Sequence, residues 1–410
     1  MLAPQFALQL GIWGMLAYST ASIGLFLFAP LARRIRAVMP TGYTSVEFVR
    51  LRYGAVAHKV FLLISLFYCL TWMVSMAMAG GKLLEILAGI PYIYGMSVIL
   101  AVCVVYTLFG GLFAVIGTDF IQSVIILIGV VVVAVAVINR ISLEEIHANL
   151  VEKRPGLLDA LMPAAIMALF NNMLFGIGEI VHSNVSWTGA FAMREDVGRK
   201  AYLLAGVLWL PIPIVAGFLG LAAPAMDIPI TSPDVVGPIV AADVLGSVGA
   251  ILVFIVVFCS LASSIDSLLA ATSDVVTTEI VRPLFMPDAN KKQLRTAAGF
   301  VIATIGVITW LICLPNVGTL ATVLFFAGPL VGSAIFPIVT GLFWPRASAT
   351  AAVLAMVLGS AGGLVAYFQL GWYTGALVGT GISFAITMIG AAVNTEQFDW
   401  KRLAAEDIGS

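Results

Sequence analysis

The chain has 410 residues, of which 61% are hydrophobic and only 10% are charged, and its formal net charge is −1. A soluble domain has about a quarter charged residues, so this composition excludes a soluble protein and indicates an integral membrane protein. The net charge gives no basic surface for nucleic acid, and the four cysteines lie singly in apolar runs, which is typical of core residues and not of disulfides or metal sites.

Apolar runs long enough to cross a hydrocarbon core of about 30 Å recur along the chain. They are continuous instead of alternating, which excludes a transmembrane β-barrel and predicts an all-α protein with about eleven transmembrane helices. The runs lie at residues 4–29, 57–88, 92–109, 112–139, 159–190, 199–224, 245–281, 296–313, 317–343, 347–369 and 372–393. Only ordinary loops separate them, so we expect one polytopic membrane domain over residues 1–393 and a tail at 394–410.

The basic residues predict the orientation, because cytoplasmic loops are enriched in Lys and Arg. Most of them lie in loops that alternate to one side of the membrane, namely Arg33, Arg34, Arg36, Arg50, Arg52, Lys59, Arg194, Arg199, Lys200, Arg282, Lys291, Lys292, Arg295, Arg346, Lys401 and Arg402. The other side has Arg140, Lys153 and Arg154, with Lys82 at the outer end of the second helix. This predicts an external N-terminus and a cytoplasmic tail.

The start of the chain is unusual for that orientation. The first apolar run begins at about residue 4, with no basic residues and no cleavable-signal pattern before it. We therefore expect that at least one helix precedes Met1 in the complete protein, either because the chain is shortened or because its start is misassigned.

The stretch from Gly110 to Gly129 places a carboxylate, Asp119, inside a helix that crosses the membrane. Asp119, Gln122 and Ser123 are spaced i, i+3, i+4 and share one helix face. An acid at membrane depth is costly and usually faces a protein-lined or water-filled interior, where it serves a pathway. The alternative is a carboxyl near the interface that reaches the lipid headgroups.

The run at 159–190 is the least regular and is rich in amides and glycines: Asn171, Asn172, Gly176, Gly178, Glu179 and His182. This pattern fits a discontinuous helix that lines a solute site, with Asn171, Asn172, Glu179 and His182 as candidate ligands. A kinked but continuous helix in which Glu179 pairs with His182 fits equally well, so both interpretations stay open.

The run at 245–281 carries a stripe of hydroxyls spaced i, i+3, i+4, i+7: Ser260, Ser263, Ser264 and Ser267. Asp266 and Asp274 lie on the same segment without a local basic partner. Serines in membrane helices are often only small packing residues. Four in register beside two acids instead favour oxygen ligands for a hard cation such as Na⁺.

Other polar residues carry weaker signals. Lys82 and Glu85 are interpreted as an interfacial pair at a helix end. No soluble-enzyme motif occurs, and no arrangement of Ser, His and Asp suggests a hydrolase, so we expect no enzyme.

At these residues the sequence resembles the sodium:solute symporter family. Its signature is matched by Gly110-Gly111-Leu112, Ala114-Val115, Thr118-Asp119, Gln122 and Gly129. Ser263-Ser264 with 274–280 resembles the sodium-binding eighth core helix of that family. Residues 201–223, with Trp187 before them, and 331–347 are most similar to its urea-transporting branch.

The resemblance implies a core of ten helices in two inverted five-helix repeats, with the first apolar run here as core helix two. It therefore implies core helices two to ten over 4–343, two peripheral helices over 347–393, and no core helix one. Residue by residue, it implies Ser263 and Ser264 as hydroxyl ligands of Na⁺, Ser260 as a carbonyl ligand, and Asp119 on the ion's route. Asp266 has a family counterpart without an assigned role, while Glu179, His182 and Asn184 depart from the urea branch.

The expected function is sodium-coupled import of a small polar organic solute, most simply a urea-like one, across the plasma or inner membrane. The expected partners are that solute and the bilayer, without nucleic acid or an obligate protein partner. Proton coupling stays open, because Glu179, His182 and Asp266 are titratable. The alternative is a non-transporting or sensor-like remnant, since core helix one is absent.

Overall fold

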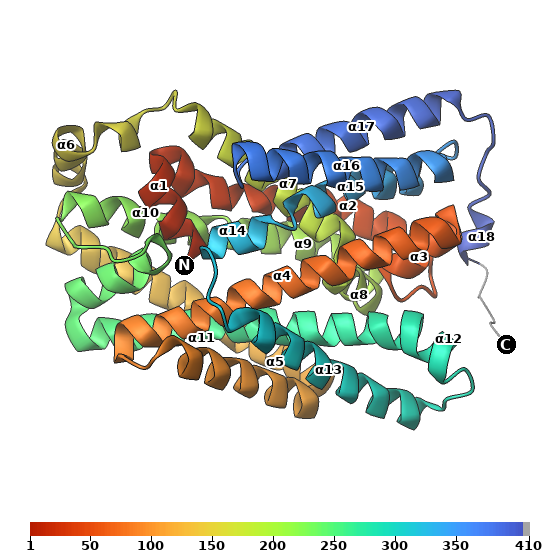
Figure 1. Ribbon diagram of the computed structural model, residues 1–410, viewed down its shortest axis with the longest axis horizontal. Helices are drawn as coiled ribbons and strands as arrows, with labels where there is room; N and C mark the ends of the chain where they lie inside the picture. Colours follow the sequence, from red (N-terminus) through yellow and green to blue (C-terminus); the bar gives the residue numbers. More distant parts are fainter. Residues whose placement is uncertain (405–410) are drawn as a thin grey trace. The chain divides into compact units, whose positions relative to one another are not determined.

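The computed structural model describes residues 1–404, except for the side chains of residues 110–116, 195 and 196. Every regular element in the part described is a helix, which confirms the all-α prediction (Figure 1). The helices are α1 (Leu2–Ala17), η1 (Tyr18–Ala21), α2 (Ser22–Val38), α3 (Ser45–Tyr53), α4 (Ala55–Ala88), α5 (Tyr92–Arg140), α6 (Leu143–Lys153), η2 (Pro155–Leu158), α7 (Pro163–His182), α8 (Asn184–Ala192), α9 (Glu195–Trp209), α10 (Pro211–Ala225), η3 (Pro233–Val235), α11 (Val236–Val276), η4 (Thr277–Val281), α12 (Arg282–Phe285), α13 (Lys291–Cys313), α14 (Leu320–Phe325), α15 (Gly328–Phe343), α16 (Ala349–Leu370), α17 (Gly375–Val393) and α18 (Lys401–Ala404).

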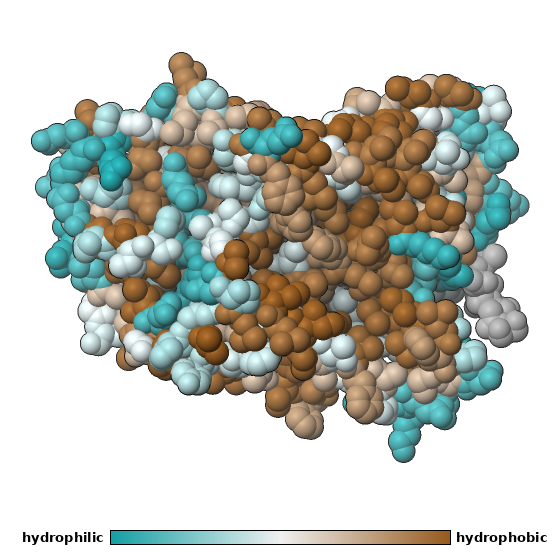
Figure 2. Space-filling model, viewed as in Figure 1, coloured by the Kyte–Doolittle hydropathy of each residue, from teal (hydrophilic) through white to brown (hydrophobic). Residues whose placement is uncertain are grey.

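Among the described residues, eleven helical stretches are long and apolar enough to cross a membrane, and each overlaps one predicted run. Figure 2 shows the wide apolar areas that such helices present on the surface of the molecule, as expected for side chains that face lipid. The chain is therefore a multi-pass membrane protein.

Helix α5 contains two of these spans, Tyr92–Phe109 and Gly117–Arg140. The side-chain hydroxyls of Tyr106 and Thr118, 12 positions apart, form a hydrogen bond. A straight helix would separate these residues by about 18 Å along its axis. The two spans are therefore not one straight helix, which agrees with the two predicted helices at 92–109 and 112–139. The signature side chains from Gly110 to Ile116 lie outside the described residues.

The chain divides into two compact units. Unit 1 comprises Met1–Ser19, Leu70–Leu169 and Pro211–Leu324, and unit 2 comprises Thr20–Cys69, Phe170–Leu210 and the chain from Phe325 onward. In unit 1, α1 packs against α10, and α5 packs against α11 (Figure 1). An apolar core that includes Val137, Leu150 and Ala222 joins α5, α6 and α10.

Two glycines in unit 1 interrupt helices with almost the same backbone conformation. Gly11 in α1 has φ 65° and ψ −143°, and Gly246 in α11 has φ 61° and ψ −144°. This region of conformational space is open only to glycine, because any side chain would collide with the backbone. Gly246 therefore marks a break within α11, next to residue 245, where the apolar run was predicted to begin; the stretch that could cross the membrane extends from Pro233 to Phe285.

In unit 2, α15, α16 and α17 lie side by side (Figure 1). Their glycines allow close backbone contact: a Cβ atom on Gly363 would lie 2.6 Å from the carbonyl oxygen of Gly375. Packing through small residues is the usual means by which helices associate in membranes. The side-chain oxygen of Asn171 accepts from the backbone amide of Ala376 at 2.8 Å, so α7 caps the start of α17.

Unit 2 also contains a buried arginine, Arg52, at the end of α3, which is only 6% exposed. Its Nε donates to the carbonyl of Gly341 at 3.1 Å, and its Nη2 donates to that of Trp344 at 3.0 Å. The guanidinium lies 4.2 Å from the ring centre of Phe398 and 4.9 Å from that of Tyr53. Carbonyls at the end of α15 and aromatic rings thus surround this charge, and no carboxylate pairs with it among residues 1–404 outside the gaps named above.

Candidate functional site

Unit 1 brings together the two polar stretches that the sequence singled out. Ser263 Oγ on α11 donates to Asp119 Oδ1 on α5 at 2.5 Å, and Ser267 Oγ donates to Asp119 Oδ2 at 3.4 Å. Asp266 lies on the same segment of α11. We call Asp119, Ser263, Asp266 and Ser267 the acid–hydroxyl cluster.

Close packing of α5 on α11 holds the cluster together. A Cβ atom on Gly129 would lie only 2.1 Å from Val256 Cγ2, so glycine is required for the helices to approach this far. Further along the same face of α5, Val133 and Val137 are buried.

The opposite face of α5 is exposed and apolar, at Ile121, Val124, Ile128, Val131, Val135 and Ile138. Their spacing of three and four residues defines one side of a helix, as expected for a face in contact with lipid. Asp119 therefore points toward protein, and the alternative in which it reaches the headgroups does not fit its contacts.

Asp266 is the most buried member of the cluster, with 0% of its surface exposed. Its Oδ1 accepts from the backbone amide of Ser267 at 2.6 Å, whereas its Oδ2 has no hydrogen-bond partner in the described part of the chain. Asp266 is about one helical turn from Ser263, the donor to Asp119, so both acids lie at the same contact between α5 and α11. Two acids in one low-dielectric site favour either a bound cation or a proton.

The cluster has acids and hydroxyls but no base. No Lys, Arg or His side chain pairs with Asp119 or Asp266 among the residues that the structure describes. Nor does that part of the chain contain a group of three or more His, Cys, Asp or Glu residues able to hold a metal ion. The donors here are hydroxyl and carboxylate oxygens, which suit a hard monovalent cation and not a transition metal.

Of the three predicted sodium ligands, only Ser263 belongs to this cluster, because its hydroxyl bonds to Asp119. Ser264 follows Ser263 on α11 and is half-buried, and Ser260 lies one helical turn earlier and is exposed. Sodium ligation by the three serines stays a prediction. From the sequence alone, Asp119 and the serines were predicted as separate features, and Ser267 was not predicted as a site residue. The signal was present, because Ser263 and Ser267 are one helical turn apart and can each reach one carboxylate oxygen.

The predicted solute residues lie on α7, in the part of that helix that belongs to unit 2, which starts at Phe170. Of the two interpretations left open for this run, the structure shows a helix that continues through both glycines and ends at His182, and α8 starts after Ser183. The glycines serve packing instead. A Cβ atom on Gly176 would lie 2.5 Å from Ala21, and one on Gly178 would lie 2.6 Å from the carbonyl oxygen of Val331.

The expected Glu179–His182 pair is also absent from the described ion pairs. Instead, the ring of Tyr68 meets that of His182 edge-on, with 4.6 Å between the ring centres. His182 is buried, with Nδ1 2.8 Å from the carbonyl oxygen of Gly178 and Nε2 without a hydrogen-bond partner among the described residues.

The two asparagines hold helices together. Asn171 caps α17 as described above, and the amide nitrogen of Asn172 donates to Thr20 Oγ1 at 3.3 Å. Gln122, half-buried on α5, has a side-chain oxygen without a hydrogen-bond partner in the described chain. A solute role for Asn171, Asn172, Glu179 and His182 stays a prediction.

The prediction that Lys82 pairs with Glu85 at the membrane interface was wrong. Lys82 forms an ion pair with Asp234, which is fully buried and whose other oxygen accepts from the backbone amide of Leu320 at 3.0 Å. Asp234 lies outside the predicted spans, so its sequence position did not mark it as a partner.

In comparisons with known proteins, the chain matches one family model and several transporters. A sequence model of the sodium:solute symporter family matches residues 5–359. The urea-proton symporter DUR3 of Oryza sativa subsp. japonica is 29% identical over 411 residues, which cover 89% of this chain and 56% of the rice protein. The osmoregulated proline transporter OpuE of Bacillus subtilis is 27% identical over 349 residues, covering 81% of this chain and 68% of that protein. The chain thus spans about half the length of the rice protein and of the urea active transporter of Saccharomyces cerevisiae, where the covered share is 52%.

Among solved structures, a Na⁺-coupled sialic acid symporter in a substrate-bound outward-open state superimposes with a TM-score of 0.67. That match is 16% identical and covers 97% of this chain and 90% of the other. Mhp1 in a closed conformation gives a TM-score of 0.56 at 16% identity, covering 99% and 93% of the two chains. These likenesses show a shared fold.

Proposed function

We propose, from the premise that this chain belongs to the sodium:solute symporter family, that it carries out cation-coupled import of a small polar organic solute. Members of this family are transporters and not enzymes. The proposed coupling ion is Na⁺, the proposed solute is urea-like, and the proposed location is the plasma or inner membrane with the tail in the cytoplasm.

The observation that carries the proposal is the acid–hydroxyl cluster. Asp119 is an acid between two membrane helices whose described partners are all neutral hydroxyls. An intramembrane acid without a fixed counter-ion is costly to keep, and its usual role is in an ion pathway. A cation that binds Asp119 would supply the missing positive charge.

Coupling follows from the same contacts. Within the described part of the chain, the hydroxyls of Ser263 and Ser267 bond to α5 through the carboxylate of Asp119. A cation at this carboxylate competes with these donors, so ion binding and the α5–α11 contact are energetically linked. A ligand shifts a conformational equilibrium by its difference in affinity between two states, and this link provides such a difference.

The choice of solute rests on relatives. Urea transporters of rice and yeast are among them, as are a proline transporter and the sodium/pantothenate symporter of Escherichia coli. Urea is a small planar diamide, and the buried polar groups on α7 are of the hydrogen-bonding type that such a molecule needs.

Uptake into liposomes tests the proposal. The chain is reconstituted, and entry of labelled urea is measured with an inward Na⁺ gradient and, separately, with choline in its place. We expect Na⁺-stimulated uptake that Ser263→Ala lowers at least tenfold. Ser273→Ala is the matched control, because Ser273 lies on the same helix and its hydroxyl, among the described residues, bonds only to the carbonyl of Ala270.

The other outcomes reject parts of the proposal. Uptake driven by a pH gradient and insensitive to Na⁺ would mean that the coupling ion is a proton, as the name of the rice urea-proton symporter states for that protein. No uptake of urea, proline, pantothenate or short carboxylates would overturn transport by this chain and favour the remnant.

A further inference from the structure

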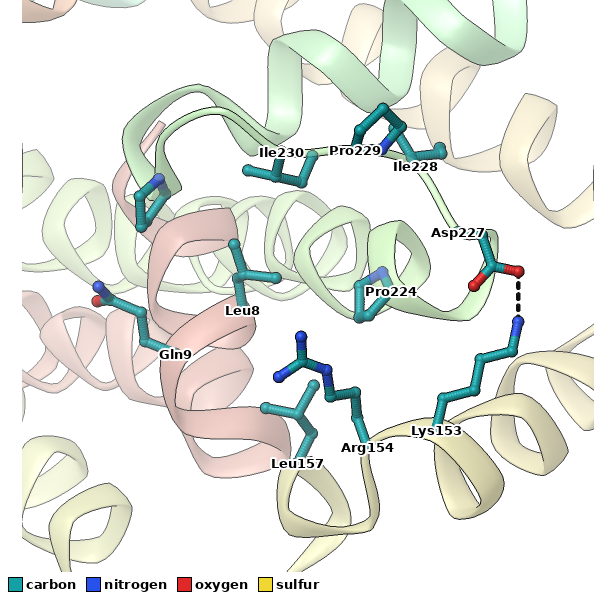
Figure 3. Close-up of a pocket in the computed structure, with 11 residues that line it drawn as sticks. Leu8, Gln9, Lys153, Arg154, Leu157, Pro224, Asp227, Ile228, Pro229 and Ile230 are labelled. Carbon is teal, nitrogen blue, oxygen red and sulfur yellow. Dashed lines mark hydrogen bonds and ion pairs between the residues drawn. The ribbon is translucent and has the colours of Figure 1, made fainter.

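We propose that unit 1 contains a second binding site, for a small organic carboxylate, in a pocket formed by loops and separate from the acid–hydroxyl cluster. The pocket has a volume of about 670 Å³, within the usual range for small-molecule sites. The start of α1, the end of α6 with η2, and the loop after α10 contribute its walls (Figure 3). We call it the loop pocket.

Hydrogen bonds fix the wall between α6 and α10. The side-chain amide of Asn149 donates to the carbonyl of Ala225 at 2.9 Å, at the last residue of α10. Lys153 Nζ at the end of α6 lies 2.5 Å from Asp227 Oδ2 in the following loop. The capping box of Ser142 and Glu145 secures the other end of α6.

The opposite wall is fixed just as closely. Gly11 lies against η2 so tightly that a Cβ atom there would be 1.9 Å from the carbonyl oxygen of Leu157. Trp13 Nε1 donates to the carbonyl of Ala160 at 2.7 Å. The pocket is therefore preformed, and a ligand does not have to order its walls, which is the main cost of binding to a loop site.

The conformation of Asp227 indicates that its side chain matters. Its φ of 56° lies in the left-handed region, and the amide of Ile228 bonds back to Ala223 at 3.0 Å, as at a helix end where glycine is the common residue. An aspartate there is less favourable than glycine but supplies the carboxylate that pairs with Lys153. This pair neutralises both charges.

Arg154 is left as the net charge of the pocket. Its guanidinium extends into the hollow beside Leu157 and toward Leu8 and Pro224 (Figure 3). No acid or other side chain bonds to it among the residues described. A guanidinium presents a planar fork of donors that matches a carboxylate in two hydrogen bonds.

The remaining walls suit the organic part of such a ligand. Leu8, Leu157, Pro224, Ile228 and Pro229 supply apolar surface, and Gln9 supplies an amide at the edge. Arg154 is exposed to solvent, and a carboxylate in the pocket would accept charge-assisted hydrogen bonds from it, which are stronger than those that a neutral amide such as urea accepts, so the pocket favours an anion. The loop pocket is thus opposite in sign to the acid–hydroxyl cluster and takes a different class of ligand.

Butyrate and its neutral isostere butyramide are the probes, titrated onto the purified chain in dodecyl maltoside, which contains no phosphate headgroup. Ligand-observed NMR reports binding without Na⁺ or transport, so the result does not depend on the proposed function. We expect saturable butyrate binding, at least tenfold weaker binding of butyramide, and at least tenfold weaker butyrate binding to Arg154→Gln.

Two further variants make the test independent of one substitution. Arg140→Gln removes a basic residue at the end of α5 that does not line the pocket, and its affinity should stay within twofold of wild type. Ile230→Trp fills the hollow without changing charge and should weaken butyrate binding. Equal binding of butyrate and butyramide, unchanged binding to Arg154→Gln, or displacement of butyrate by an equal concentration of inorganic phosphate would overturn the proposal.

Discussion

Two charged side chains that lie between helices, the half-buried Asp119 and the buried Arg52, have opposite kinds of surroundings. Asp119 in unit 1 receives hydrogen bonds from the hydroxyls of Ser263 and Ser267, and no base pairs with it in the described chain. Arg52 in unit 2 has no acid partner there either, but it donates to carbonyls of Gly341 and Trp344 and stacks on aromatic rings.

The two side chains differ in whether the surrounding groups offset their charge. Carbonyls at a helix C-terminus carry partial negative charge, and aromatic faces do so too, so the surroundings of Arg52 offset its charge permanently. Hydroxyls stabilise a carboxylate by hydrogen bonds but carry no net charge. Arg52 is therefore part of the scaffold, whereas Asp119 is suited to exchange a mobile cation.

Of the two compared side chains, the arginine should cause the larger loss of stability when it is removed. Arg52→Met leaves the carbonyls of Gly341 and Trp344 without their donor and removes the cation from its rings, so the free energy of unfolding should fall by about 3 kcal/mol. Thermal unfolding in detergent, followed by tryptophan fluorescence, measures it. Arg36→Met is the control, because Arg36 makes one such bond, to Phe191 at 2.8 Å, and should lose about 1 kcal/mol. Equal losses in the two variants would show that Arg52 has no special role.

A second prediction uses the tyrosine beside this arginine. Tyr53 donates to the carbonyl of Pro337 at 2.7 Å, and burial raises the pKa of Tyr53 to about 12 from the usual 10.0, an effect that Arg52 partly offsets. Because the folded state favours the neutral phenol, its contribution is present below pH 10 and is lost as the pH rises through 12. Wild type should lose up to about 2.5 kcal/mol of stability over this window relative to Tyr53→Phe. Parallel pH profiles of the two proteins would contradict the pKa shift.

The smallest effect on stability is expected at the acid. Asp119→Asn keeps an oxygen that accepts from Ser263 and removes an unbalanced charge, so the free energy of unfolding should change by less than about 1 kcal/mol. The matched control is Asp234→Asn, which leaves Lys82 buried without its counter-ion and should cost about 3–5 kcal/mol. Similar losses in both variants would mean that Asp119 is a structural acid like Asp234.

Hydropathy was enough to predict the helices, because each span carries its own apolar residues and needs no partner to be recognised. The polar contacts were harder. Asp119 and Ser263 were each identified, yet their contact depends on how α5 packs on α11, which spacing within one helix does not encode. For the same reason Lys82 was assigned to its neighbour Glu85 instead of the distant Asp234.

The burial of Arg52 is another contact that could not be predicted from spacing within one helix. Arg52 entered the sequence argument only as a positive charge that sets orientation, and its burial under the tail was not foreseen. On α7, two glycines left a helix break and a continuous helix equally open, and the structure shows that each glycine provides room for a neighbouring backbone. Glycine has both uses, and only the packed structure distinguishes them.

The most direct test of the acid–hydroxyl cluster is the thermal stability of the chain as Na⁺ replaces choline at constant ionic strength. An ion that binds only the folded state stabilises it by about 2.7 kcal/mol at 100 times its dissociation constant. We predict a rise in the unfolding temperature for wild type and Ser273→Ala, and no rise for Ser263→Ala or Asp119→Asn. A rise of the same size in all four proteins, or in none of them, would contradict a cation site at Asp119.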